Sequence, residues 1–478
     1  MPVSAANGTH TDAPPRPKPR RRVVLLPAAA VALAASLVVG LLTHGPTAWG
    51  LLPIALYAVL ALTGMDLLLV TALALAGSVL VALPPPAETG DVLAASVIDP
   101  VTVIGVIIVF GAATGEVLRV TGVADALVRG IMRIVDGHGT TVLMYGMLLA
   151  CLVLVAALGT LAGALAIAAP LLVPIAANAG FTRSATAATM FLGGCAGLAL
   201  APFAGSNIAI MNTADVGYLT YVTVGAGPLV LLSLVLAAVV VPWVQRSSAA
   251  REDFYHPGEV TGPSASTGAG PTARTRRATW AFALALAVTV VHATATKAGT
   301  TFPLVALPLM ALVTATAAGL SPRRAGRALL TGARRMLPML VLFWMLAALF
   351  GFIDLLKPYD VVLDTFGSQL SHMAALPLAL AVAALGWVGV PGATAAQVIL
   401  IGEVFGPLGT ELGIGPAAWV IVLLWASKAD TYGPLPNANM VGAMGLARAD
   451  RLPYLLGTGW ALLVPACALY TALLALIL

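Results

Sequence analysis

Two stretches of this sequence carry the same interrupted pattern, and each lies inside apolar sequence long enough to cross a bilayer. The first copy joins a turn at Gly159 to a later break that begins at Gly205, 46 residues further on. The second joins a turn at 386–394 to a break that begins at Gly433, 47 residues after Gly386. Matching Gly/Pro interruptions in two halves of a membrane protein indicate a transporter's binding site. The pattern therefore predicts a duplicated helical transporter.

Composition indicates that most of the chain lies in lipid. Hydrophobic residues make up 60% of the sequence and charged residues only 9%, with a mean hydropathy of +1.00, whereas soluble domains carry about 25% charged residues. The apolar runs have the length of bilayer-spanning helices, and no strand alternation is visible. We therefore expect an all-α polytopic membrane protein. The net charge of +5 comes mainly from loop arginines, which indicates membrane topology and no nucleic-acid partner.

Loop charges orient the predicted helices. Residues 1–22 are polar and rich in proline and arginine, which predicts a disordered cytoplasmic tail before an extra transmembrane helix at 23–44; a secretory or twin-arginine signal is the alternative. Arginines also mark the segments 245–278 and 322–335, which should face the cytoplasm. The loop 85–99 carries only acidic charges and should face outward. We expect a multi-pass protein of a bacterial-type cytoplasmic membrane, with its N-terminus in the cytoplasm.

The two halves have opposite charge bias, which predicts inverted repeats. An amphipathic stretch at 116–137 is arginine-rich, whereas the corresponding stretch at 354–372 is mainly acidic. The first repeat is expected over 45–244 and the second over 279–478. A flexible cytoplasmic linker at 245–278 joins them. The extra N-terminal helix is the odd span that reverses the first repeat relative to the second.

Each repeat is expected to contain a re-entrant hairpin and a broken helix. Residues 140–178 form two half-helices that meet at Gly159, with two complete spans joined by a tight turn as the alternative. A single helix over 185–216 would be about 48 Å long at 1.5 Å per residue, which exceeds a hydrocarbon core of about 30 Å. We therefore expect a break near Pro202 and Gly205. Irregular backbone persists in a membrane only where it lines a cavity or is buried in protein.

The turns and breaks supply a candidate binding site. Half-helix N-termini favour anions, and freed backbone carbonyls favour Na⁺. The candidate substrate-binding residues are small or polar members of these segments: Gly159, Thr160, Ser206, Asn207, Asn212, Gly392, Thr394, Asn437 and Asn439. A candidate Na⁺ position is bordered by four residues of the breaks: Gly205, Asn207, Gly433 and Asn437. Gln397, just after the second turn, is a further polar lining residue.

The second copy of the pattern is more polar than the first. Lys428 and Asp430 lie two residues apart in an apolar segment, and ionisable groups inside a membrane are costly and mark functional sites. We expect this pair to couple transport to an ion, with Asp430 as the proton- or cation-linked carboxylate and Lys428 as a cation near the substrate. A structural ion pair that fastens the broken helix is the alternative.

No enzymatic motif accompanies these features. The sequence has no phosphate-binding P-loop, no HExxH or Cys/His metal spacing and no nucleophile elbow, which argues against an ATP-driven pump and against most enzymes. We expect no catalytic residue, no structural metal and no cofactor, with H⁺ or Na⁺ as the coupling ion.

The arrangement resembles the ion transporter superfamily, which includes gluconate, C4-dicarboxylate, citrate and divalent-anion carriers and NhaC-type sodium/proton antiporters. The resemblance covers residues 50–478 and rests on five segments: 115–125, Gly159-Thr160, Gly205 to Asn207, Pro391 to Thr394, and Gly433 to Asn439. It implies two hairpins and two broken helices around one site, and a homodimer. Some sodium/dicarboxylate members carry Ser-Asn-Thr at the breaks. Here Ile208 follows Asn207 and Ala438 follows Asn437, so that pattern is only partly kept.

Two functional hypotheses follow. The first is a secondary active transporter in the lipid bilayer that carries a small organic anion (carboxylate), coupled to protons or sodium, by alternating access. The second is a sodium (cation)/proton antiporter on the same scaffold, motivated by Lys428 and Asp430. A non-transporting membrane component is disfavoured by the matched breaks.

Overall fold

Every named element of the described chain is helical. The computed structural model describes residues 19–43, 45–62, 65–135, 137–256, 272–296, 301–358, 361, 365, 374–388 and 394–478. Among these residues, seven segments are long and apolar enough to cross a membrane: Pro100–Val120, Thr140–Leu158, Leu161–Asn178, Arg183–Thr213, Tyr218–Ala249, Pro322–Asp354 and Leu452–Ile477. The chain is an all-α polytopic membrane protein, as its composition predicts.

The helices form two inverted repeats, preceded by the extra helix α1 (Pro19–Leu42). The first repeat contains α2 (Leu52–Leu62), α3 (Leu67–Ala82), α4 (Pro86–Ile98), α5 (Pro100–Val120), α6 (Val123–Val135), α7 (Thr140–Leu158), α8 (Leu161–Asn178), α9 (Arg183–Leu200), α10 (Gly205–Thr213), α11 (Tyr218–Tyr221) and α12 (Gly227–Ala249). The second contains α13 (Ala273–Ala295), α14 (Pro303–Ala317), α15 (Pro322–Asp354), α17 (Ala375–Leu385), α18 (Thr394–Glu411), α19 (Pro416–Tyr432), α20 (Ala438–Ala447) and α21 (Leu452–Ile477). Short helical turns at Ala48–Leu51 and Gly386–Val388 precede α2 and follow α17.

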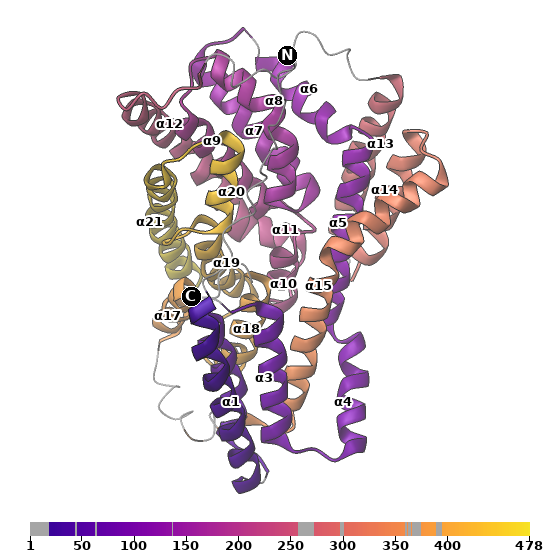
Figure 1. Cartoon of the computed structure of the whole chain (residues 1–478), viewed down its shortest axis with the longest axis vertical. Helices are drawn as coiled ribbons and strands as arrows, with labels where there is room; N and C mark the ends of the chain where they lie inside the picture. Colours follow the sequence, from indigo (N-terminus) through magenta and orange to yellow (C-terminus); the bar gives the residue numbers. More distant parts are fainter. Residues whose placement is uncertain are drawn as a thin grey trace, which may run out of the picture.

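The helices are arranged in two groups. The scaffold comprises α1 to α6 and α13 to α15, and the hairpin bundle comprises α7 to α12 and α17 to α21 (Figure 1). Contacts repeat between the halves: α3 packs on α15 as α14 packs on α5, and α10 packs on α18 as α20 packs on α8. At the centre of the scaffold, Gly332 lets α15 touch the backbone of α5 at Ala112, where a side chain would collide. The repeats therefore interlock, and neither forms a separate domain.

The two hairpins enter the bundle from opposite ends. α7 and α8 lie in the upper part of Figure 1, and α17 and α18 lie in the lower part. α7 ends at Gly159, whose φ of 67° is a left-handed conformation that glycine adopts without strain. α8 begins two residues later and packs back against α7. α7 and α8 therefore form a tight helical hairpin that turns at Gly159.

Two segments that were predicted as loops are helical. The acidic loop at 85–99 contains α4, because Pro86 is well placed in the first turn of a helix. Asp99 then starts α5 by accepting a hydrogen bond from Val101 N at 2.7 Å. The arginine loop at 322–335 is the first part of α15, which begins with Pro322. The 33-residue α15 thus corresponds to α4 and α5 together.

The linker between the repeats is partly attached to the hairpin bundle. α12 continues to Ala249, and residues 250–256 fold back so that Tyr255 OH donates to Ala447 O at 3.0 Å. The second repeat begins with α13 at Ala273. Several predicted segments lie outside the described residues: the tail at 1–18, the tether at 257–271 and most of the amphipathic stretch at 354–372.

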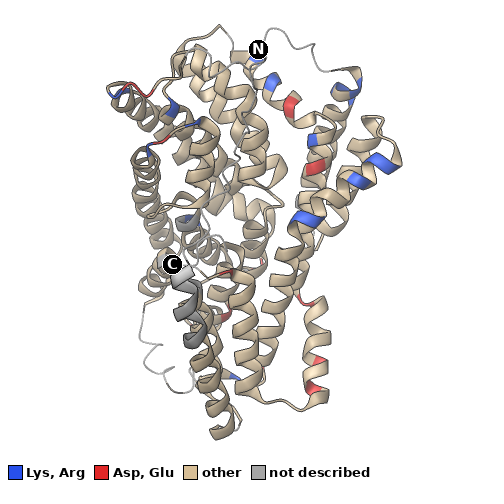
Figure 2. Ribbon diagram, in the orientation of Figure 1, with Lys and Arg blue, Asp and Glu red and all other residues tan. Residues whose placement is uncertain are grey.

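Charged residues are separated between the two ends of the molecule. Arginines gather at the upper end of both groups, and most acidic residues of the scaffold lie at the lower end (Figure 2). This separation agrees with the loop charges from which the inverted orientation was predicted.

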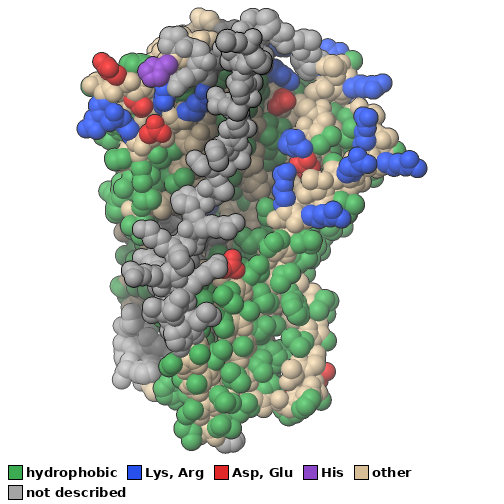
Figure 3. Space-filling view, in the orientation of Figure 1, with side chains coloured by type: hydrophobic (Ala, Val, Ile, Leu, Met, Phe, Trp, Pro, Cys, Tyr) green, Lys and Arg blue, Asp and Glu red, His purple; other side chains and the backbone are tan. Residues whose placement is uncertain are grey.

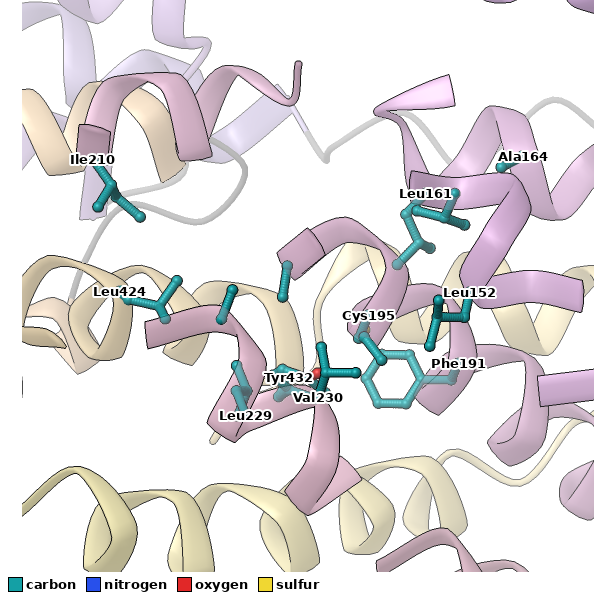
Figure 4. Close-up of a cluster of buried hydrophobic side chains, with 14 of the residues drawn as sticks. Leu152, Leu161, Ala164, Phe191, Cys195, Ile210, Leu229, Val230, Leu424 and Tyr432 are labelled. Carbon is teal, nitrogen blue, oxygen red and sulfur yellow. The ribbon is translucent and has the colours of Figure 1, made fainter. Parts of the chain in front are cut away.

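A continuous apolar core holds the hairpin bundle together. It includes Leu152 of α7, Phe191 of α9, Leu229 of α12 and Leu424 of α19, each at most 8% exposed (Figure 4). The ring of Phe191 meets the ring of Tyr432 edge-on, with centroids 6.2 Å apart. This contact joins the two broken helices, one from each repeat, across the core.

Candidate functional site

The first hairpin tip lies against the first break. A Cβ atom on Gly159 would be 3.6 Å from both Ala204 N and the carbonyl carbon of Phe203. α8 starts just after the tip, and α10 starts just after the break, at Gly205. We call this meeting point the first junction. It brings together the predicted residues Gly159, Thr160, Gly205, Ser206 and Asn207.

The second hairpin lies against the second broken helix in the same way. Gly386 contacts Ala426 of α19, and Trp387 packs edge-on against Trp460 with ring centroids 6.1 Å apart. Trp460 Nε1 in turn donates to Pro434 O in the break at 3.1 Å. We call this meeting point the second junction. The predicted residue Gly392 lies in the turn at 389–393, outside the described residues.

At the first junction, Asn207 closes the break by capping the end of α9. Its side chain is fully buried, and its Nδ2 donates to the carbonyls of Leu198 at 2.8 Å, Ala199 at 3.1 Å and Ala201 at 2.8 Å. Ser206 Oγ lies 3.4 Å from its Oδ1. The amide nitrogen of Asn207 is thus fully used inside the protein.

Two tyrosines of α11 cap the same helix end. Tyr218 OH donates to Leu200 O at 2.6 Å, and Tyr221 OH donates to Ala199 O at 2.8 Å. The sequence analysis missed both residues. Two tyrosines three positions apart, directly after a broken helix, were the available signal, because a phenol can reach carbonyls that the break releases. The freed carbonyls near the predicted Na⁺ position therefore already have internal donors.

Both half-helices that start at the first junction lack a side-chain cap. Thr160 precedes α8 and Ala204 precedes α10, and neither side chain accepts a hydrogen bond from the first turn. Uncapped N-termini leave backbone N–H groups and a partial positive charge directed at the junction. The arrangement can bind an anion.

The second junction is capped differently. Asn437 precedes α20, and its Oδ1 accepts from Met440 N at 2.9 Å. Its Nδ2 donates to Thr431 O at 3.3 Å, across the break to the end of α19. Asn439 is half-buried in the first turn of α20. The N-terminus of α20 is therefore capped by a side chain, unlike those of α8 and α10.

Gln397 leaves an unused acceptor at the second junction. The residue is 6% exposed, and its Nε2 donates to Gly386 O at 2.8 Å. Its Oε1 has no hydrogen-bond partner among the described residues. Because the anchored nitrogen fixes the direction of the amide, Oε1 must point away from Gly386. Buried acceptors without a partner are rare, since each costs about 1–3 kcal/mol.

Lys428 lies in the interior of the hairpin bundle and is 2% exposed. The ammonium group of Lys428 interacts electrostatically with the thiol of Cys195 on α9. Other buried polar contacts surround it: Cys195 Sγ lies 3.9 Å from Thr431 O, and Tyr432 OH lies 3.3 Å from Ser233 Oγ. The backbone of Asp430 lies in α19, and its side chain is outside the described part. The buried cation thus sits where α9 and α19 meet.

The remaining predicted residues lie between the bundle and the scaffold or at the start of α18. Asn212 of α10 borders a pocket, together with Pro100 and Ile104 of α5. Thr394 is the first residue of α18. A second, mainly apolar pocket separates the first break from α13 and is lined by Phe203, Tyr218, Thr289 and Ala293, among others.

Comparison with known proteins supports a secondary transporter. Residues 20–244, which are α1 and the first repeat, match the model of the Na⁺/H⁺ antiporter family. The YdaH transporter of Alcanivorax borkumensis has a similar structure, with a TM-score of 0.57 at 16% identity over 95% of this chain and 98% of that chain. MtrF of Neisseria gonorrhoeae, described as illuminating a class of antimetabolite efflux pumps, gives 0.51 at 12% identity over 80% and 83%.

No curated protein matches the sequence significantly. The two structural likenesses show that the chain has the fold of these transporters. Together with the family match, they support a transporter of the Na⁺/H⁺ antiporter-like kind and leave the narrower resemblance to gluconate, C4-dicarboxylate or NhaC-type carriers without support.

Proposed function

We propose that this protein is a secondary active transporter that carries a small organic anion, a carboxylate, and couples its movement to protons or sodium. Alternating access would move the hairpin bundle against the scaffold, because the candidate residues Asn207, Asn437 and Gln397 all belong to the bundle. The cavities between the two groups lie on the path of such a movement.

The observation that carries this proposal is the pair of uncapped half-helix N-termini at the first junction. α8 and α10 both begin there, and the tip at Gly159 contacts the break at Ala204. Backbone N–H groups at helix N-termini bind carboxylate and phosphate oxygens, and the helix dipole favours negative charge. Thr160 and Ser206, both half-buried at this place, would add hydroxyl contacts.

The second junction supports the coupling step. Gln397 Oε1 is an acceptor that can bind a cation or a hydrogen-bond donor. Lys428 lies on α19, two positions beyond Ala426, against which the hairpin tip rests. We assign ion coupling to Lys428 and Asp430, and anion binding to the first junction.

Uptake by the full-length protein in proteoliposomes tests the proposal. Radiolabelled mono- and dicarboxylates are offered under imposed pH, Na⁺ or combined gradients, with protein-free liposomes as the control. The panel includes an antimetabolite, because MtrF is described as an efflux pump for such compounds. Gradient-driven accumulation of at least one anion is expected. Absence of accumulation for every anion under every gradient would refute the anion carrier.

A sodium/proton antiporter is the second candidate, and the match of residues 20–244 to the Na⁺/H⁺ antiporter family favours it. It predicts that Na⁺ dissipates a pH gradient across proteoliposomes with no organic substrate present. Asp430→Asn should abolish this signal, since the coupling carboxylate is removed. A full signal in that variant would contradict the role assigned to Asp430.

A further inference from the structure

Eight arginines form one exposed surface at the upper end of the scaffold. They lie in the first two turns of α13 and the first half of α15, and all are exposed: Arg274, Arg276, Arg277, Arg323, Arg324, Arg327, Arg334 and Arg335. A Cβ atom on Gly319, in the turn before α15, would be 3.9 Å from Arg274 Nε. The two groups are therefore continuous, as the cluster at the upper right of Figure 3 shows. We call this the arginine surface.

Almost no negative charge balances the arginine surface. The sequence contains no aspartate or glutamate between Glu259 and Asp354. Glu116 of α5 contacts it at one edge, where its Oε2 lies 3.6 Å from Arg335 Nη1, but this buried carboxylate is also bound by Arg119. The other seven arginines have no ion pair with a described residue. A surface with this charge excess attracts anions.

Apart from Arg335, which contacts Glu116, the arginines of α15 do not lie on the packed face of the helix. On α15, Ala328 and Gly332 face the other way and pack against α14 and α5. The other arginines of α15 stay exposed and have no ion pair with a described residue: Arg323, Arg324, Arg327 and Arg334. Guanidinium groups with free donors bind phosphate oxygens in a bidentate manner.

The arginine surface borders apolar surface that faces away from the protein. Along α13, the arginines are followed at helical spacing by Trp280, Leu284, Val288 and Val291, which are 58–72% exposed. Trp residues concentrate at the boundary between lipid tails and headgroups. The arginines therefore lie at the level of lipid headgroups, and the apolar stripe lies at the level of the tails.

We propose that the arginine surface binds anionic phospholipids. Their phosphate groups would contact the guanidinium groups of α13 and α15, and their acyl chains would cover the stripe that begins at Trp280. The lipid is favoured over a free phosphate compound because only the lipid complements both the charge and the adjoining apolar surface.

The hairpin bundle provides a matched control at the same end of the molecule. Arg246 and Arg251 are exposed, as the arginine-surface residues are, but they adjoin the acidic residues Glu252 and Asp253. Removing these two arginines changes the net charge of the same end of the protein without touching α13 or α15.

Lipid-dependent thermal stability of the purified full-length protein tests the proposal. Phosphatidylglycerol, phosphatidylcholine or pyrophosphate is added to protein in neutral detergent, and the Tm is followed by intrinsic fluorescence. Phosphatidylglycerol should raise the Tm more than phosphatidylcholine, and high salt should reduce the difference. The triple variant Arg323→Gln/Arg324→Gln/Arg327→Gln should lose most of this difference, whereas Arg246→Gln/Arg251→Gln should keep it.

Three results would overturn the proposal. They are an undiminished lipid effect in the triple variant, an equal effect of phosphatidylcholine, and an equal effect of pyrophosphate, which would indicate a free-anion site. If the glutamine variant does not fold, the Arg→Lys triple variant replaces it. It keeps the charge but loses bidentate contacts, so it should show a reduced preference, and an unchanged one would contradict the proposed contacts.

Discussion

The two junctions have the same architecture and opposite chemistry. At the first, Asn207 and two tyrosines satisfy the carbonyl end of α9, while the N-termini of α8 and α10 carry no side-chain cap. At the second, Asn437 caps α20, and Gln397 Oε1 has no partner among the described residues. Among the described residues, the first junction thus presents donors, and the second presents an acceptor.

Under the proposed function, this difference would divide one transport cycle between the two copies of the pattern. In each repeat, a hairpin tip packs against a broken helix. The C-terminal carbonyls of one half-helix and the N-terminal amides of another therefore lie near the centre of the bundle. Side chains cap either the carbonyls or the amides, and the uncapped backbone groups remain available to a ligand. A donor-rich junction suits an anion, and an acceptor-bearing junction suits a cation or a proton.

The largest expected effect is at the buried lysine of the second junction. Lys428→Met should abolish ion-coupled uptake and lower the stability of the protein by about 3–5 kcal/mol if Asp430 is left as an uncompensated buried charge. Uptake in proteoliposomes and the Tm in detergent measure the two effects separately.

The double variant Lys428→Met/Asp430→Asn separates coupling from a structural ion pair. If the two residues couple transport, the double variant recovers stability but not ion-coupled uptake. Recovery of both would show that the pair only fastens the broken helix, and the assigned difference between the junctions would fail.

Replacing either of the two capping asparagines by alanine should lower stability by a smaller amount, and the two losses should differ. Asn207→Ala removes the side-chain donor from the carbonyls of Leu198 and Ala201, whereas Ala199 O keeps Tyr221 OH. Stability should fall by about 2 kcal/mol. Asn437→Ala removes a helix cap at a half-buried site, for which about 1 kcal/mol is typical. Chemical or thermal denaturation in detergent gives both values. Equal losses would contradict the different roles of the two asparagines.

The asparagines also show what could be predicted from the sequence and what could not. Glycine and proline at Gly159, Pro202 and Gly433 predicted the hairpins and breaks, because both residues weaken a helix. They do not always end one, since Pro170 and Pro174 lie inside α8. They could not predict the direction of an amide group. Asn207 can ligate a cation with oxygen or cap carbonyls with nitrogen, and only the positions of neighbouring atoms decide between them.

The predicted helix boundaries were wrong for a related reason. The segments 85–99 and 322–335 were predicted as loops because they are charged or polar, yet Pro86 and Pro322 begin helices there. Charge indicates that a segment leaves the lipid, and it does not show that the helix ends. The tyrosine caps were missed because they depend on contacts across the break that no spacing rule contains.

The unused acceptor of the second junction gives the next prediction. Gln397→Leu keeps the volume of the side chain but removes Oε1, so the half-saturating Na⁺ concentration for uptake should rise about tenfold, the equivalent of about 1.4 kcal/mol. Initial uptake rates at varied Na⁺ and varied substrate concentrations measure it. A raised substrate KM with unchanged Na⁺ dependence would place a substrate donor at this acceptor instead.

Gln245→Leu is the matched control for that experiment. Gln245, like Gln397, donates from its side-chain amide to a backbone carbonyl: Nε2 donates to Gly180 O at 2.9 Å. Unlike that of Gln397, its Oε1 also has a partner, because it accepts from Thr182 N at 2.9 Å. Its replacement should lower the Tm and leave the Na⁺ dependence unchanged. If Gln397→Leu behaves like this control, Gln397 does not contact a transported species.

The smallest effect is expected at the tyrosine caps of the first junction, and it tests whether the carbonyls there are closed to ligands. Tyr218→Phe removes the described side-chain donor to Leu200 O, and about 1 kcal/mol of stability should be lost. Tyr221→Phe should cost less, because Ala199 O keeps its second donor, Asn207 Nδ2. In neither variant should Na⁺ raise the Tm more than in the wild-type protein. A new Na⁺-dependent stabilisation in Tyr218→Phe would mean that the freed carbonyl recruits a cation, and that the first junction differs from the second only by the hydroxyl groups that cover it.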